Sequence, residues 1–399
     1  MIYNQKPDGE PWHIALLALL IVACVNGLTT TGITTFDESI LRDLGGTRAD
    51  LKLRDTVNFW GAALLLPVTG WLMDKGGART TSLMGLVLLG GSVFLYGRAT
   101  SLLQLYLLHG VFAMSIGLTG SLAMIVLVTR LFTKNRGLAV GLALAGTSVG
   151  GMAMGQIMPW VLESTHWRTA FSYLAILPFL MAGLVYVVVP KSGTSESTVR
   201  QADKDTSLPL SAALALPSFW LVALAGFLTF GTILAIYQNI FLHMRDLNFS
   251  PKQTGSGIAL LSVFALSAKL VSGFLSDRMG SKILLMISLV IMATGIGLLA
   301  SLKANLVWTG LACIGLGWGG ANTLINYLCI QVFGVAAAGR ISGTISTAES
   351  IGAGIGPFAA AKLFDATKSY GSAFGFMVVI LFASLIAIYF VRMPKKLST

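Results

Sequence analysis

Two ionisable side chains, Lys269 and Glu349, lie deep inside long apolar stretches of the sequence. Lys269 stands eight residues before Asp277, which is about 12 Å along a helix. Glu349 stands nine residues after Arg340, or about 13.5 Å by the same helical rise. If both helices cross a membrane, the two groups lie at nearly one depth, close to the middle of a hydrocarbon core about 30 Å thick. A charge at that depth is costly unless it is paired or hydrated, so both residues are candidate functional groups.

Two interpretations of this pair stay open. Lys269 and Glu349 could form a buried ion pair that only holds helices together. Alternatively, Lys269 binds a substrate carboxylate, and Glu349 is its alternate partner or carries a proton. An anion that displaced Glu349 from Lys269 would favour protonation of the displaced carboxylate through desolvation and loss of its positive neighbour. Anion and proton would then cross the membrane together.

Neutral polar residues in the apolar stretches supply further candidates. Asn26 shares a helix face with Thr30, and Asn322 shares one with Asn326, because residues four apart lie one above the other. Such groups either join helices or face a cavity. The predicted substrate-binding residues are Lys269, Asn26, Tyr237, Asn322 and Asn326. His109, near the outer end of its stretch, is interpreted either as a hydrated or backbone-bonded group or as a gating or proton-relay residue that takes part in proton coupling.

The composition argues against most other classes of function. Hydrophobic residues make up 55% of the 399 residues and charged residues only 11%, whereas soluble proteins carry about 25% charged residues. No nucleophile–base–acid set, phosphate loop or metal-ligand cluster is present in the sequence, and the three cysteines lie in apolar stretches. We therefore expect no enzymatic activity, no metal and no cofactor. The net charge of +11 is scattered over short turns, which argues against nucleic-acid binding.

The apolar stretches predict an all-α integral membrane protein with twelve transmembrane helices, since about 20 residues cross the core. The domain boundaries expected are an N-terminal six-helix half (1–190), a polar cytoplasmic linker (191–216) and a C-terminal six-helix half (217–399). The predicted spans are 12–36, 56–73, 79–99, 102–131, 136–162, 167–190, 217–243, 254–276, 281–301, 304–333, 340–363 and 370–392.

A repeated motif relates the two halves. The stretch from Gly70 to Arg79 returns as the stretch from Gly273 to Lys282, with Asp, a following cation, Gly and a second cation at the same spacing. Internal duplication of this kind is common in transporters. Segments on the side of both termini hold more Lys and Arg than those on the other side, which places the termini in the cytoplasm of an inner-membrane protein. The segment from Asp37 to Asp55 is expected to be an outer loop.

Twelve spans in two pseudo-symmetric halves, with this motif after spans 2 and 8, resemble the major facilitator superfamily. The resemblance implies alternating access between the halves. It also implies that Asp74, Arg79, Asp277 and Lys282 form a conformational latch on the cytoplasmic side.

A narrower resemblance appears in spans 4 to 6. The stretches Val128–Phe132, Arg136–Gly141 and Trp167–Phe171 are similar to those of the oxalate/formate antiporter and monocarboxylate transporter branch. That branch usually has an Arg four residues before the Gly of the second motif, where this sequence has Lys269. Span 11 carries the acid Glu349, whereas the oxalate carriers have a second cation there. Oxalate is therefore disfavoured as the substrate.

The resemblance, together with Lys269, implies a monomeric secondary transporter of small organic anions, with monocarboxylates as the expected class. Because Glu349 matches the central Lys269, proton coupling by symport is favoured over exchange. The partners of the transporter would be the anion, protons and the lipid bilayer. Two alternatives stay open: a proton-coupled exporter of amphipathic compounds, and a transporter-like membrane sensor. Substrate size, direction, stoichiometry and the favoured conformation are not predictable from these residues.

Overall fold

The computed structural model describes residues 10–132, 135–190, 210–334 and 338–393, and this part of the chain is helical without a β-strand. The helices of the first half are α1 (Trp12–Asn26) continued by the π-helical η1 (Gly27–Gly32), α2 (Asp37–Leu44), α3 (Arg48–Tyr96), α4 (Leu102–Thr119), α5 (Ser121–Leu131), α6 (Arg136–Ser164), α7 (Trp167–Leu174) and α8 (Ile176–Val188). Those of the second half are α9 (Leu210–Leu214), α10 (Pro217–Asp246), α11 (Pro251–Met279), α12 (Ser281–Ala300), η2 (Ala304–Leu306), α13 (Val307–Phe333), α14 (Ala338–Thr367) and α15 (Tyr370–Phe390).

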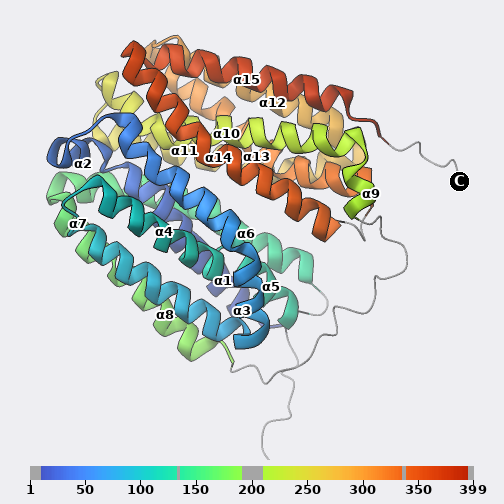
Figure 1. Ribbon diagram of the computed structural model, residues 1–399, viewed down its shortest axis with the longest axis horizontal. Coiled ribbons are helices and arrows are strands. Elements are labelled where there is room, and N and C mark those ends of the chain that lie inside the picture. The colour runs from blue at the N-terminus through green and yellow to red at the C-terminus, as the bar shows by residue number, and fades with distance from the viewer. Residues whose placement is uncertain (1–9, 133–134, 191–209, 335–337, 394–399) are drawn as a thin grey trace, which may run out of the picture.

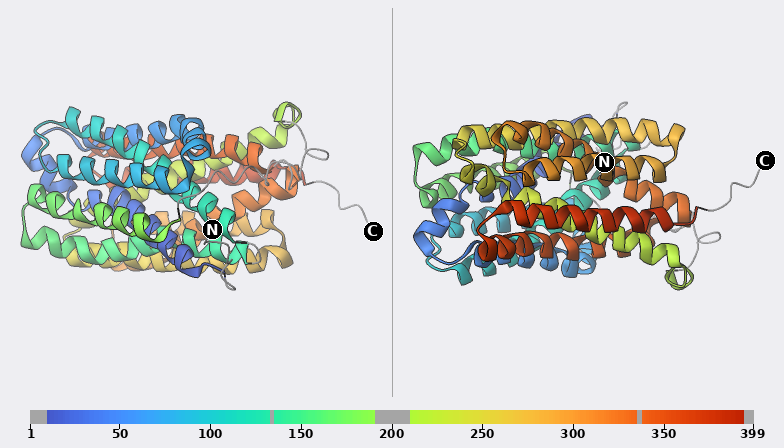
Figure 2. Two further views of the ribbon diagram at one scale, coloured as in Figure 1. Left: turned by 90° about the horizontal axis from the view of Figure 1, so that it is seen from below. Right: turned by 90° about the horizontal axis from the view of Figure 1, so that it is seen from above.

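The helices gather into two bundles that lie side by side (Figure 1). The long helices run roughly along one common axis (Figure 2). Each bundle has its own apolar core. The buried residues of one core lie between Ile14 and Val189, and those of the other lie between Ala213 and Val391. Most of the linker expected at 191–216 falls in 191–209, outside the described residues, and α9 occupies part of the remainder.

Nine helical segments within the described residues are long and apolar enough to cross a membrane. The three other predicted spans correspond to the first part of α3, to α13 and to α14. Gly, Asn, Ser and Thr residues lower the mean hydropathy of α13 and α14. The first part of α3 includes side chains that lie outside the described residues. Polar residues are tolerated in a membrane helix that packs against other helices. The nine segments therefore fit the predicted architecture, while the count of twelve is a prediction.

The repeated motif has a structural reason in its glycine. Gly77 breaks the long helix α3 with φ 70° and ψ 158°, and the equivalent Gly280 ends α11 with φ 82° and ψ 139°. Backbone conformations with positive φ favour glycine because a Cβ atom would clash. Both copies of the motif thus use the same residue to turn the chain between two spans.

The prediction of an outer loop from Asp37 to Asp55 is wrong. Asp37 begins α2, and α3 begins at Arg48, eight residues before the predicted start of span 2. Thr47 and Asp50 form a capping box, in which each side chain accepts a hydrogen bond from the backbone N–H of the other residue. This cap satisfies the free amide groups of the first turn, so the helix includes charged residues that the hydropathy criterion excluded.

The two halves meet along two pairs of long helices, α3 with α14 and α6 with α11. The second contact is a backbone contact: a Cβ atom on Gly255 would lie 2.0 Å from the carbonyl oxygen of Gly155. We call the end of the bundle that holds α2 the α2 end. The opposite end, which holds α9, is the motif end (Figure 1). The chain turns there at Gly77, inside α3, and at Gly280, between α11 and α12.

Candidate substrate-binding site

Lys269 lies on α11 and reaches across to the other half of the molecule. Its ammonium group donates hydrogen bonds to Thr147 Oγ1 at 2.9 Å and to Ser148 Oγ at 3.3 Å, both on α6. Among the described side chains, no carboxylate lies within salt-bridge distance of this ammonium. Lys269 is thus a partly buried cation held by neutral hydroxyl groups alone.

Glu349 lies on α14 and faces α10 of its own half. Its side chain is 7% exposed, and a Cβ atom on Gly226 would lie 3.0 Å from its Cγ. Its Oε1 has no hydrogen-bond partner among the described residues. Lys269 and Glu349 are about 15 Å and 16.5 Å from the motif-end termini of their helices, so their depths agree with the expectation. The purely structural ion pair of the first interpretation is not formed in this structure, because the two side chains point toward different neighbouring helices.

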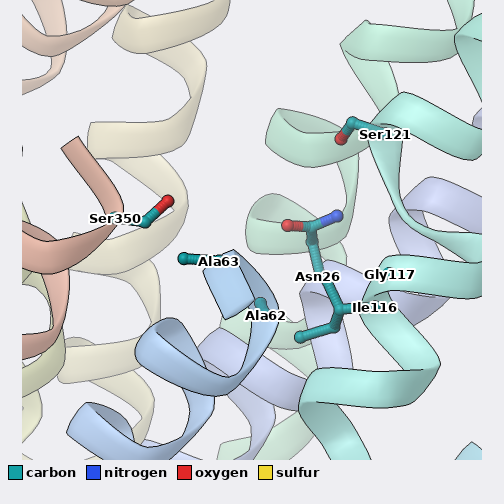
Figure 3. Close-up of a pocket in the computed structure, with 7 residues that line it drawn as sticks. All are labelled: Asn26, Ala62, Ala63, Ile116, Gly117, Ser121 and Ser350. Carbon is teal, nitrogen blue, oxygen red and sulfur yellow. The ribbon is translucent and has the colours of Figure 1, made fainter. Parts of the chain in front are cut away.

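A cavity of about 190 Å³ lies between α1, α3, α4, α5 and α14. It is lined by Asn26, Ala62, Ala63, Ile116, Gly117, Ser121 and Ser350 (Figure 3). Asn26 extends into the space between Ser121 and Ile116, while Ser350 approaches from the other half (Figure 3). The Asn26 amide also donates to the Val22 carbonyl oxygen at 3.1 Å. Of the predicted binding residues, Asn26 therefore lines a cavity between the halves, and this cavity does not include Lys269.

The other predicted polar residues have different surroundings. Tyr237 joins the halves through a 2.7 Å hydrogen bond between its hydroxyl and Thr31 Oγ1, and its ring packs edge-on against Trp318. Asn326 is exposed and donates to the Asn322 carbonyl oxygen of the previous turn at 3.1 Å. Neither asparagine of α13 lines the cavity in Figure 3.

His109 is fully buried in α4 among aromatic rings. Its Nδ1 lies 2.9 Å from the Leu105 carbonyl oxygen, and its ring centroid lies 5.0 Å from that of Phe112 and 5.5 Å from that of Tyr96. The backbone contact matches the simpler of the two interpretations of this residue. A gating or relay role stays a prediction.

The predicted latch residues can be described only in part. Arg79 donates to the Tyr186 carbonyl oxygen at 2.5 Å, and Lys282 donates to the carbonyl oxygens of Tyr389 and Val391. Each cation therefore contacts its own half. The side chains of Asp74 and Asp277 lie outside the described residues.

The sequence reasoning missed a charged cluster at the α2 end. Lys52 and Arg54 both bind Asp37, with a Lys52 Nζ–Asp37 Oδ2 distance of 2.5 Å, and Asp55 lies 3.8 Å from the Lys52 ammonium. All four side chains are buried, and their charges balance. Lys52 also donates to the Gln238 backbone carbonyl oxygen in the other half. The pattern of a capping box, Thr47 followed by Asp50, is the sequence signal that could have placed these charges inside a helix.

An outer layer of polar contacts closes the same end. Arg48 forms two hydrogen bonds with Asp246, at 2.6 and 2.7 Å, and Arg245 contacts Glu38 at 3.0 Å. Asp365 of α14 accepts hydrogen bonds from the first backbone amides of α3, at 2.8 Å from Ala49 and 3.3 Å from Arg48. Lys252 pairs with Glu163 at 2.8 Å. Every one of these pairs joins the two halves, so the α2 end is closed.

Asp43, on α2 outside the spans, is held by a tryptophan at this end. Trp167 Nε1 donates to Asp43 Oδ2 at 2.8 Å, and His166 Nε2 lies 3.0 Å from the same oxygen. The hydrogen bond from Trp167 stabilises the carboxylate and lowers the pKa of Asp43 below its usual 3.8. Among the described residues no cluster of three or more His, Cys, Asp or Glu could hold a metal.

Comparisons with known proteins agree with this architecture. The sequence model of the Major Facilitator Superfamily matches residues 19–357. The oxalate:formate antiporter of Oxalobacter formigenes is 24% identical over 357 residues, which cover 87% of this chain and 84% of the antiporter. Monocarboxylate transporter 13 of Bos taurus is 24% identical over 383 residues, covering 94% and 88%.

The fold is similar to that of a bacterial homologue of the human lysosomal transporter Spinster in an inward-facing and occupied conformation. The TM-score is 0.75 at 15% identity, over 96% of this chain and 97% of that one. The family match, the two helical halves and the apolar spans lead to one conclusion. The chain belongs to the Major Facilitator Superfamily and is a multi-pass membrane transporter related to the monocarboxylate and oxalate carriers.

Proposed function

We propose that this protein is a proton-coupled secondary transporter of small organic anions, with monocarboxylates as its substrate class. The observation that carries the proposal is the ammonium of Lys269, which lies between the two halves and, among the described side chains, hydrogen-bonds only to the hydroxyls of Thr147 and Ser148. Hydroxyl groups satisfy hydrogen bonds but leave the positive charge without compensation. A cation in these surroundings gains most from an anionic ligand.

Glu349 is the proposed proton carrier. A buried carboxylate with an unpartnered oxygen is costly as an anion, and taking up a proton removes that cost. Because Glu349 does not pair with Lys269, a substrate that binds the ammonium has no carboxylate to displace. The anion and the proton therefore bind at separate positions of similar depth, and coupling arises because the halves exchange access more readily when both are bound.

We infer the orientation from the positive-inside rule: the motif end and both termini lie on the cytoplasmic side of the cell (inner) membrane. The α2 end then faces outward, and its closure supports an inward-facing state. Alternating access would open the contacts of Arg48, Lys52 and Asp365 and close the motif end. We further propose that the transporter acts as a monomer.

The test is uptake of radiolabelled lactate and benzoate into proteoliposomes that contain the purified protein. An inside-alkaline pH gradient should drive saturable uptake, and an entrapped pH dye should report acidification of the lumen. Lys269→Gln should abolish uptake. Glu349→Gln should retain exchange of labelled for unlabelled substrate but lose accumulation driven by the pH gradient, because a neutral amide cannot carry the proton.

Other results would separate the remaining alternatives. Gradient-driven export of amphipathic cations that survives in Lys269→Gln would identify an exporter of amphipathic compounds. Saturable binding of a carboxylate without flux of any label would identify a membrane sensor. Full accumulation by Glu349→Gln would remove the proton-carrier role while leaving the anion site intact.

A further inference from the structure

The hydroxyl of Thr147 is oriented by its own helix. Thr147 Oγ1 lies 2.9 Å from the Leu144 carbonyl oxygen, to which it donates its proton. Its lone pairs therefore remain for the Lys269 ammonium, 2.9 Å away. Since this proton is already used, Thr147 holds the ammonium as an acceptor and is not itself placed to donate to a substrate carboxylate.

The helix that carries Thr147 has little freedom to shift relative to Lys269. Towards the α2 end, α6 and α11 touch through Gly155 and Gly255 without intervening side chains. Between this contact and Thr147, a Cβ atom on Gly151 would lie 2.6 Å from Ser262 Oγ on α11. The backbone contact thus fixes the distance between the two helices, and the hydroxyl of Thr147 occupies a defined position in front of the ammonium.

A lysine side chain needs such a support to bind an anion well. It has a flexible stem, and ordering this stem costs side-chain entropy. The ammonium has three N–H donors, of which Thr147 and Ser148 accept two. A carboxylate in place of these hydroxyls would neutralise the lysine, whereas a hydroxyl orients it and leaves both its charge and its third donor available.

We propose that Thr147 is the positioning residue for the anion-binding ammonium of Lys269, with Ser148 as a weaker second support. The inference rests on the proposed function and adds a residue to its substrate site. Thr147 belongs to the first half and Lys269 to the second. The two halves therefore orient the ammonium together, at the contact between α6 and α11.

The experiment compares KM and Vmax for lactate uptake into proteoliposomes by the wild type, Thr147→Val, Thr147→Ser and Ser148→Ala. Valine keeps the shape of threonine without the acceptor, so KM should rise about tenfold, the equivalent of 1.4 kcal/mol, with Vmax nearly unchanged. Thr147→Ser should restore KM to within about twofold of the wild type. Ser148→Ala, which removes the longer contact, should raise KM by about threefold, within the range for one hydrogen bond.

Thr129→Val is the matched control, because Thr129 Oγ1 also donates to its own helix, at 2.8 Å from the Ile125 carbonyl oxygen. Its KM should equal that of the wild type. A KM for Thr147→Val equal to that of Thr129→Val would overturn the positioning role. Equal losses in Thr147→Val and Thr147→Ser, together with lowered melting temperatures, would assign Thr147 to packing and also overturn it.

Failure of the proposed function gives a different result. A wild-type protein without saturable carboxylate uptake, or a Lys269→Gln variant with the wild-type KM, overturns the anion site itself and the positioning role with it. A tenfold rise in KM that serine rescues supports both.

Discussion

Lys52 and Lys269 are two lysines at the boundary between the halves, and their partners differ in kind. Lys52 is fully buried and binds the Asp37 carboxylate within a cluster of balanced charge. Lys269 binds two hydroxyls and no carboxylate among the described residues. The charge of a buried cation with a carboxylate partner is already neutralised, and an anionic ligand would have to displace that partner. The charge of a cation with hydroxyl partners is not neutralised, so it can bind an anionic ligand without displacing a carboxylate.

The difference assigns the two lysines to different tasks. Lys52 stabilises the first half and, through the Gln238 carbonyl oxygen, the closed α2 end. Lys269, in the function proposed above, binds the anionic substrate. Substitution of each lysine should therefore separate stability from transport.

Lys52→Met should destabilise the protein most. Removing one partner of a buried ion pair leaves an uncompensated charge, which costs about 3–5 kcal/mol. The cluster would keep Arg54 against two carboxylates, Asp37 and Asp55. Thermal unfolding in detergent should show a strongly lowered melting temperature. Lys269→Gln should melt close to the wild type, since its neutral partners lose only hydrogen bonds. Equal destabilisation by the two substitutions would remove the distinction between them.

Asp365→Ala should weaken closure of the α2 end. Asp365 caps the N-terminus of α3 from the opposite half, and loss of a helix cap costs about 1 kcal/mol. Spin labels at Ser101 and Lys303, exposed residues at the α2 end of each half, would report the separation in a background without native cysteines. Asp365→Ala should raise the population with the longer distance between the two labels about fivefold relative to the shorter one, which corresponds to about 1 kcal/mol.

Lys252→Gln provides the control for this measurement. It removes an exposed pair with Glu163, and such pairs contribute about 0–1 kcal/mol. An unchanged distance distribution in Asp365→Ala would show that the cap does not contribute to closure.

Asp43→Asn should have the smallest effect, and the effect should depend on pH. The folded-state pKa of Asp43 lies below its usual value, so its carboxylate contributes stability above the unfolded pKa, near 3.8. That contribution is lost as the pH falls through the lower, folded pKa. The melting temperature of the variant should therefore lie slightly below that of the wild type at pH 6, and the gap should close below pH 4. A constant gap would assign the effect to packing.

The architecture could be predicted because the membrane imposes it. Apolar stretches and the repeated motif indicate paired halves, whereas the positive φ of Gly77 and Gly280 is known only from the structure. The start of α3 could not be obtained from hydropathy. Lys52, Arg54 and Asp55 look like loop residues until their charges are balanced by Asp37, which comes from a different helix.

The depth of Lys269 and Glu349 in the membrane could be predicted from the sequence, but the helix that each side chain faces could not. Counting residues places Lys269 and Glu349 at one level, since helical rise is fixed. Which helix each side chain faces depends on rotation and packing, and these turned Lys269 toward Thr147 and Glu349 toward Gly226. Thr147 itself was missed because a threonine that bonds its own helix has no distinctive sequence pattern.

The most direct test of the central claim is binding of benzoate to purified wild-type and Lys269→Gln protein. Binding is measured from the melting temperature of each protein over a series of benzoate concentrations. A ligand that binds the folded state raises its stability by RT ln(1 + [L]/Kd), about 2.7 kcal/mol at 100 times Kd. We predict a concentration-dependent rise in melting temperature for the wild type and none for Lys269→Gln. Equal rises in the two proteins would show that the Lys269 ammonium is not the group that binds the anion.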